Sequence, residues 1–121
     1  EGVLAQRLIR KLCPLCKAPY RLSADEVPRD MVEEMPDQVF KPVGCRECRD
    51  TGYAGRTGIF ELLRSEVGVR QLCVERASAD QIRHYAMQNG FKTLRHSGWQ
   101  KVFSGITSVE EVNRITKADP V

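Results

Sequence analysis

The chain lacks the features that mark secreted, membrane and many catalytic proteins. No apolar run approaches the ~20 residues of a spanning helix, and nothing resembling a signal peptide opens the chain. The only histidines, His84 and His96, stand in no Ser/His/Asp grouping with suggestive local context, so we expect surface or packing roles for them and find no catalytic constellation. What remains, 121 residues with 41% hydrophobic and 29% charged, is typical of one soluble domain or two small ones.

Two cysteine pairs are the most informative feature present. They read Cys13-Pro14-Leu15-Cys16 and Cys45-Arg46-Glu47-Cys48, with 28 residues between them. A CxxC turn lets two thiolates reach one ion, and two such turns complete the tetrahedral Cys₄ shell that Zn²⁺ prefers. We therefore predict one zinc ion bound by Cys13, Cys16, Cys45 and Cys48. Such a closed shell leaves no position for water, so the zinc should be structural and not catalytic.

Three other interpretations of the pairs are disulfides, an iron–sulfur cluster and a thioredoxin-like redox pair. The absence of a leader favours a cytosolic setting, where thiols stay reduced and such pairs usually bind metal. The fifth cysteine, Cys73, argues against a closed disulfide framework, and its apolar neighbours indicate a small core residue.

Charge alone does not point to a nucleic-acid partner. The formal net charge of +3 falls to about +1 when four thiolates and one Zn²⁺ add about −2. Basic residues close to the pairs in sequence offset the charge of the loaded site: Arg10, Lys11, Lys17, Arg46 and Arg49. The chain opens Glu1-Gly2-Val3-Leu4 without an initiator methionine, so we expect it to be cut from something larger.

The first half of the chain mixes short elements around the cysteines. Leu4, Leu8 and Leu12 recur at helical spacing and predict an amphipathic helix over residues 3–12. Ser23 and Glu26 form a capping box that predicts a short helix over about residues 23–34. Residues 38–43 then favour a strand.

Glycines recur every third residue after the second pair, at Gly52, Gly55 and Gly58. No Lys-Ser/Thr follows and the run leads into an apolar strand over residues 59–63, so a phosphate-binding loop is excluded on both counts. Glycine here more simply allows positive φ or close backbone approach.

From Ser65 onward, capping residues and terminating glycines predict four short helices. We expect them to form a small bundle with Trp99 in or near its core. The break in composition near Leu63 favours a helical unit that folds without the cysteine module. The fold class is therefore α+β, a small Cys₄ zinc module with short strands followed by a C-terminal bundle of short helices. The expected helices lie near residues 66–74, from Ser78 with Gln81 to Gly90, from Thr93 to Gly105, and from Thr107 with Glu110 or Ser108 with Glu111.

Five stretches carry a family resemblance in unbroken order: residues 5–10 (AQRLIR), 12–17 (LCPLCK), 43–48 (VGCREC), 52–63 (GYAGRTGIFELL) and 105–116 (GITSVEEVNRIT). Together they resemble the C-terminal part of the type II secretion and type IV pilus assembly ATPases, over residues 3–118. In that family a RecA-like nucleotide-binding domain drives a hexameric cytoplasmic motor beneath an inner-membrane platform. A tetracysteine metal module is inserted near its end.

The resemblance implies a domain plan. Residues 1–12 would end the RecA-like ATPase core, residues 13–50 would form the tetracysteine zinc module, residues 51–64 would return to the core, and residues 65–121 would form a C-terminal helical domain. The implied setting is cytoplasmic and peripheral to the bacterial inner membrane. The implied partners are neighbouring subunits of a homo-hexamer and platform proteins, with membrane contact only through them.

ATP and Mg²⁺ are implied only for the intact parent. This chain has no G-x-x-x-x-G-K-[ST] and no acidic Walker B strand, so it should not hydrolyse ATP alone. Arg56 matches a family arginine that approaches nucleotide in the intact motor, and an arginine fork suits phosphate. The alternative for Arg56 is a partner in the zinc shell or a carboxylate such as Glu61.

A nucleic-acid-binding zinc ribbon is the alternative function. It requires aromatic residues interleaved with basic ones, and only Tyr20 and Tyr53 lie near the cysteines, so we expect no nucleic-acid partner. The motifs do not distinguish secretion from pilus assembly.

Overall fold

Two long strands form the spine of the computed structural model, which describes residues 2–64, 67–88 and 92–116. Strand β1 (Gly2–Leu12) pairs antiparallel with β4 (Tyr53–Arg64), from Gly2↔Arg64 to Leu12↔Tyr53, with a register shift between Arg10 and Leu12. A second, shorter antiparallel pair joins β2 (Ala18–Tyr20) to β3 (Val39–Lys41). The long β1–β4 pair is called the ribbon below.

Short helices make up the rest of the described chain. Two 3₁₀ helices, η1 (Ala24–Glu26) and η2 (Arg29–Glu34), lie between β2 and β3. After β4 come α1 (Val67–Val74), α2 (Ala79–Gln88), α3 (Leu94–Phe103) and α4 (Val109–Ile115). Among the described residues, no helix has the length and hydropathy needed to cross a membrane.

The helix expected over residues 3–12 is wrong, because these residues form β1. Residues four apart share a face in a strand as well as in a helix, so the leucine spacing did not distinguish the two. Leu4 and Leu8 do lie on one face of the ribbon. Pairing with β4, about fifty residues further along the chain, decides for the strand.

The helix expected over residues 23–34 is divided into η1 and η2. Ser23 caps the first turn by accepting from the Asp25 N–H at 3.4 Å. Pro28 then follows Val27, whose backbone is extended (φ −95°, ψ 139°). A residue before proline is disfavoured in the helical region, so the helix breaks there and restarts. The predicted strands are confirmed in β3 and in β4, which is longer than expected.

The caps of the later helices largely follow the sequence pattern. Ser78 and Gln81 exchange backbone-to-side-chain hydrogen bonds of 2.8 and 3.1 Å, which confirms the capping box of α2. Thr93 caps α3, and Ser108, not Thr107, caps α4. The expected start of α1 near residue 66 and the expected end of α2 at Gly90 lie outside the described residues.

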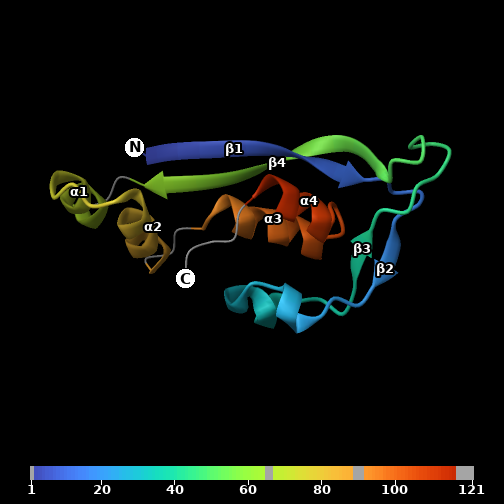
Figure 1. Ribbon diagram of the computed structural model, residues 1–121, viewed down its shortest axis with the longest axis horizontal. Coiled ribbons are helices and arrows are strands. Elements are labelled where there is room, and N and C mark those ends of the chain that lie inside the picture. Colours follow the sequence, from blue (N-terminus) through green and yellow to red (C-terminus); the bar gives the residue numbers. More distant parts are fainter. Residues whose placement is uncertain (1, 65–66, 89–91, 117–121) are drawn as a thin grey trace.

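The four helices do not form the expected bundle. Helix α1 packs on α2, whereas α3 and α4 pack on each other and on the ribbon. Figure 1 shows α3 and α4 between the ribbon above and the η1–η2 segment below. Helices of seven to ten residues bury too little surface to stand alone, so α3 and α4 take partners on both sides.

The hydrophobic core joins the cysteine module to the C-terminal helices. Trp99 is fully buried, as expected, but its neighbours come from both halves of the chain. This differs from the expectation of a helical unit that folds by itself. The cluster, called the shared core below, comprises Leu22, Val27, Met31, Val39, Trp99, Val102 and Val112.

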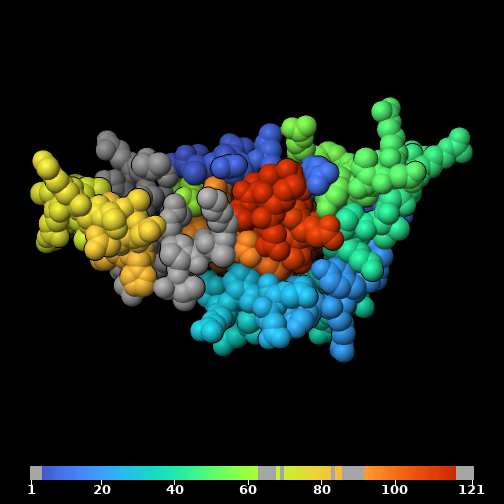
Figure 2. Space-filling view, viewed as in Figure 1, coloured from blue at the N-terminus to red at the C-terminus, as the bar shows by residue number. Residues whose placement is uncertain are grey.

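The two faces of the ribbon differ in burial. Ile9 and Ile59 are fully buried on the side that meets α3 and α4. The opposite face, called the bare face below, exposes four large apolar side chains. These are Leu4 (62% exposed), Leu8 (53%), Phe60 (47%) and Leu62 (48%). Strand β1 runs along the upper rim of the molecule in Figure 2.

Candidate metal centre and the clamp beside it

The four paired cysteines converge on one point. Their sulfur atoms all lie within 4.8 Å of one another. The Sγ atoms of Cys13 and Cys45 are 3.8 Å apart, those of Cys16 and Cys48 are 3.7 Å apart, and those of Cys45 and Cys48 are also 3.7 Å apart. A tetrahedral site with Zn–S bonds of about 2.3 Å has sulfur–sulfur edges of about 3.8 Å. The donor set and its spacing therefore fit a tetrahedral metal ion such as Zn²⁺.

The ends of the ribbon bring the two cysteine turns together. Cys13 follows β1 and donates its N–H to the Gly52 carbonyl (2.9 Å), one residue before β4. Gly52 has φ +82°, and a Cβ there would lie 2.4 Å from the Cβ of Pro42. Only glycine both adopts this positive φ easily and leaves room for Pro42, so the turn that carries Cys45 and Cys48 depends on Gly52.

Backbone N–H groups point at the sulfurs. Cys48 Sγ accepts from the N–H groups of Cys45 and Gly52, both at 3.2 Å, and Cys16 Sγ accepts from Gly44 at 3.3 Å. Burial raises the pKa of the Cys48 thiol, but the N–H groups of Cys45 and Gly52, together with the neighbouring Cys45 and Cys16 thiols, outweigh it and lower the pKa to about 6. Donors of this kind stabilise the thiolate that a metal requires.

The fifth cysteine lies apart from this cluster. Cys73 is exposed on α1, so its expected role as a core residue is wrong. The adjacent Val74 is 81% exposed as well. The apolar residues next to Cys73 in the sequence therefore did not indicate burial. No histidine joins the metal-binding cluster found among the described residues.

Two of the five basic residues near the cysteines attach the C-terminal helices. Lys17 Nζ donates to the Gly105 carbonyl at 2.9 Å and lies 4.4 Å from the centre of the Phe40 ring. Arg10 binds Glu111. The other three, Lys11, Arg46 and Arg49, are exposed.

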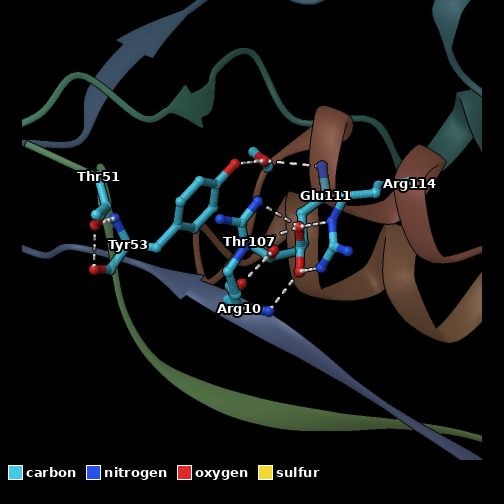
Figure 3. A network of polar contacts seen from close by, with 7 residues as sticks. Arg10, Thr51, Tyr53, Thr107, Glu111 and Arg114 are labelled. Carbon is cyan, nitrogen blue, oxygen red and sulfur yellow. Dashed lines mark hydrogen bonds and ion pairs between the residues drawn. The ribbon is translucent and has the colours of Figure 1, made fainter.

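A buried carboxylate holds β1 to α4 (Figure 3). The Glu111 side chain is 0% exposed and accepts the Arg10 N–H at 2.8 Å. Its Oε1 accepts from Arg10 Nη2 at 3.0 Å, and its Oε2 from Arg114 Nη2 at 2.9 Å. Burial raises the pKa of Glu111, but the bonds from Arg114 and Arg10 outweigh it and bring the pKa from 4.5 to about 2.

Tyr53 completes this arrangement. The set of Arg10, Tyr53, Thr107, Ser108, Glu111 and Arg114 is called the clamp below. The Arg10 guanidinium lies 4.1 Å from the centre of the Tyr53 ring, a cation–π contact. The Tyr53 hydroxyl is 2.7 Å from Ser108 Oγ at the start of α4. Thr107 Oγ1 donates to the Arg10 carbonyl at 2.8 Å. The clamp therefore ties both strands of the ribbon to the helix cap.

Sequence reasoning missed the clamp. Glu111 and Arg114 are three apart on a helix, a visible ion-pair spacing. The pairing with Arg10, 101 residues away, carries no local signal.

Arg56 lies at the same end of the ribbon. It is exposed in β4, next to Gly55 with φ +78°. Within the described part of the chain, Arg56 makes no side-chain hydrogen bond or ion pair. Glu61, offered as its alternative partner, accepts the Leu94 N–H at 2.8 Å. Arg56 and Glu61 are five apart in one strand and so face opposite sides.

Comparison with known proteins gives consistent matches. The family model described as Type II/IV secretion system protein matches residues 1–114. The Type IV pilus assembly ATPase TfpB of Acinetobacter baylyi is 41% identical over 117 residues, which cover 94% of this chain and 20% of the relative. The Type II secretion system protein E of Aeromonas hydrophila is 43% identical over 119 residues, which cover 98% of this chain and 24% of the relative. This chain thus spans about a fifth to a quarter of the length of these relatives.

Proposed function

Because this chain belongs to the Type II/IV secretion system protein family, we propose that it is the zinc-binding and C-terminal helical region of a hexameric ATPase that powers type II protein secretion or type IV pilus assembly. The observation that carries the proposal is the Cys₄ cluster of tetrahedral spacing, in a chain 41% identical both to a Type IV pilus assembly ATPase and to a Type II secretion system ATPase. Identities of 41% and 43% do not favour one system over the other.

The metal has a structural role in this proposal. Cys13, Cys16, Cys45 and Cys48 hold one Zn²⁺ and leave no open position for a substrate. The site joins the end of β1 to the segment that enters β4, and the chain between the two pairs carries four of the seven residues of the shared core. Zinc therefore fixes the segment between the two cysteine pairs, residues 17–44, called the arm below. Helices α3 and α4 pack on this arm, and the metal supplies no chemistry of its own.

The ribbon is proposed to belong to the ATPase core. Residues 1–12 and 51–64 would join the RecA-like sheet, residues 13–50 would be the zinc module and residues 65–121 the helical domain. The bare face of the ribbon supports this plan, because an isolated two-stranded ribbon is marginal and four large apolar side chains are exposed on it. The part of this first segment that the structure describes would join that sheet as the strand β1.

Nucleotide chemistry is proposed for the intact motor only. ATP and Mg²⁺ would bind elsewhere in the parent, and Arg56 would approach the nucleotide from the end of the ribbon. Its exposure and its lack of a partner within the described residues support this role, since an arginine fork suits phosphate. The motor would work in the cytoplasm against inner-membrane platform proteins, with neighbouring subunits as its other partners.

A nucleic-acid partner is not part of the proposal. Tyr20 packs against the shared core and Tyr53 stacks on Arg10, so both aromatic candidates have partners within the fold. A salt-dependent gel shift with single- and double-stranded DNA tests this, because phosphate contacts weaken steeply with salt.

The deciding experiment has two parts. Metal analysis of the purified chain should give one equivalent of zinc. Less than half an equivalent, with the four paired cysteines titrating as free thiols besides Cys73 in the native state, would remove the zinc assignment. In the intact motor, Arg56→Ala should reduce ATP hydrolysis with zinc content unchanged. A loss in kcat indicates transition-state stabilisation, and a raised KM alone indicates ground-state binding.

Arg46→Ala is the matched control for this substitution. Arg46 is another exposed arginine in a cysteine knuckle, and its removal should leave both constants near wild type. Wild-type constants for Arg56→Ala would make Arg56 a structural residue and end its proposed nucleotide role.

A further inference from the structure

Two arginines occupy opposed positions on the two strands of the ribbon. Arg10 of β1 and Arg56 of β4 are direct Cα partners in the antiparallel register. Directly opposed side chains in such a pair share one face, and like charges there destabilise each other. The sequence separation of 46 residues hides this pairing, which appears only once the strands are aligned.

The clamp resolves the conflict by taking up one of the two charges. Glu111 binds Arg10 through its backbone N–H and through both Nε and Nη2 of the guanidinium, at 2.8, 3.2 and 3.0 Å. The face of that guanidinium lies on Tyr53, so its orientation is fixed as well as its charge. Arg56 is left exposed, with no hydrogen bond or ion pair to another described residue.

The clamp also fixes the backbone that leads to Arg56. Tyr53 begins β4, three residues before Arg56, and its hydroxyl is bonded to Ser108 at the cap of α4. Thr51 Oγ1 donates to the Cys48 carbonyl at 2.8 Å and accepts the Tyr53 N–H at 3.1 Å. The turn between the metal centre and Arg56 is therefore held at both ends.

We propose that Glu111 is a positioning residue for Arg56: by binding Arg10 it holds the Arg10 guanidinium in place and offsets its positive charge, which leaves Arg56 available to an anionic phosphate ligand. This inference rests on the nucleotide role proposed for Arg56. Glu111 itself touches no ligand. Its effect passes through Arg10 and the ribbon register.

The experiment measures ATP hydrolysis by the intact motor. Glu111→Gln keeps the side-chain volume and removes the charge, and should lower kcat/KM about 3- to 10-fold, in the range of coupled neighbouring residues. The double variant Arg10→Gln/Glu111→Gln removes the opposing charge as well, and should restore at least half of the lost kcat/KM. In an Arg56→Ala background, Glu111→Gln should cause no further loss.

Arg114→Gln is the matched control. This substitution removes the second arginine that binds Glu111 but leaves every hydrogen bond between Glu111 and Arg10 in place. The value of kcat/KM should therefore stay within about twofold of wild type. Zinc content and circular dichroism report whether each variant is folded. If Glu111→Gln does not fold, Glu111→Asp replaces it, since the shorter carboxylate keeps its charge but withdraws from Arg10; an intermediate loss is then expected.

Each outcome decides between the two claims. If Arg56→Ala lowers hydrolysis but folded Glu111→Gln does not, the positioning role is overturned and the proposed function stands. If Glu111→Gln is not rescued by Arg10→Gln, or adds fully to Arg56→Ala, Glu111 is a structural residue only. If Arg56→Ala has no effect, the nucleotide role fails and the positioning role with it.

Discussion

Removing zinc should loosen α3 and α4 as well as the cysteine module. The reason is the shared core, in which Trp99, Val102 and Val112 of the helices pack against side chains from between the two cysteine pairs. Without the metal, the two ends of the arm are no longer joined, and its own secondary structure is limited to short 3₁₀ turns and a pair of three-residue strands. We expect chelation to release the arm and to uncover one side of α3.

The size of the effect follows from burial. Met31 and Val39 are fully buried, and Leu22 and Val27 are 6% and 5% exposed. Burying one such side chain contributes about 1.5–3 kcal/mol, so the four together contribute about 6–12 kcal/mol as an upper estimate. That is comparable with the whole free energy of unfolding of a small domain, about 5–15 kcal/mol. The helices should therefore not survive intact when the arm leaves.

Trp99 provides the measurement, because it is the single tryptophan of the chain and is fully buried. Chelation, or Cys13→Ser, should shift its fluorescence to longer wavelength and remove hydrogen-exchange protection from both the arm and α3. Cys73→Ser is the matched control, since Cys73 is exposed outside the metal cluster and its loss should change neither signal. Full protection of α3 in chelated protein, alongside loss in residues 13–50, would refute the reasoning and restore two independent units.

Three further substitutions test separate parts of the structure. Gly52→Ala should cost about 2–4 kcal/mol in urea unfolding and weaken zinc binding, because it combines a positive φ with a clash at Pro42; wild-type stability would show that the turn relaxes. The free energy of unfolding of the wild type should exceed that of Glu111→Gln by at most about 3 kcal/mol. In urea unfolding at different pH values, this difference should be constant between pH 8 and 5 and decline only from about pH 4.5 toward 2. The folded pKa of Glu111 is the depressed one, so stability is lost as pH falls, and a slope between pH 6 and 8 would contradict the assignment. Ser108→Ala removes the cap of α4 and the partner of Tyr53 and should lower the thermal midpoint by an amount corresponding to about 1–2 kcal/mol, whereas an unchanged midpoint would exclude both roles.

Local signals identified the four cysteines that converge and most of the helix caps. Four cysteines in two CxxC turns specify their own ligand geometry, since each pair lies within one tight turn. Ser78 and Gln81 likewise satisfy each other within four residues. The apolar run after Gly58 predicts a strand and forms one. Each CxxC turn and each cap is local, whereas the meeting of the two turns and the formation of β4 also require pairing of the two strands of the ribbon.

The ribbon shows where local signals failed. The leucines of residues 3–12 fit a helix and a strand equally, because both repeat on one face every four residues. Hydrogen bonding with β4 settled the choice. The same pairing placed Arg10 opposite Arg56, a relation that neither segment carries by itself.

The sequence by itself determined which four cysteines converge, the CxxC turns that present them, most of the helix caps and the family to which the chain belongs. Only the tertiary structure decided that β1 is a strand, that Trp99 packs against the cysteine module and that Glu111 binds Arg10. The physical reason is range: capping and CxxC turns are satisfied within a few residues, whereas burial of Trp99 and pairing of Glu111 with Arg10 require segments about 60 to 100 residues apart to meet.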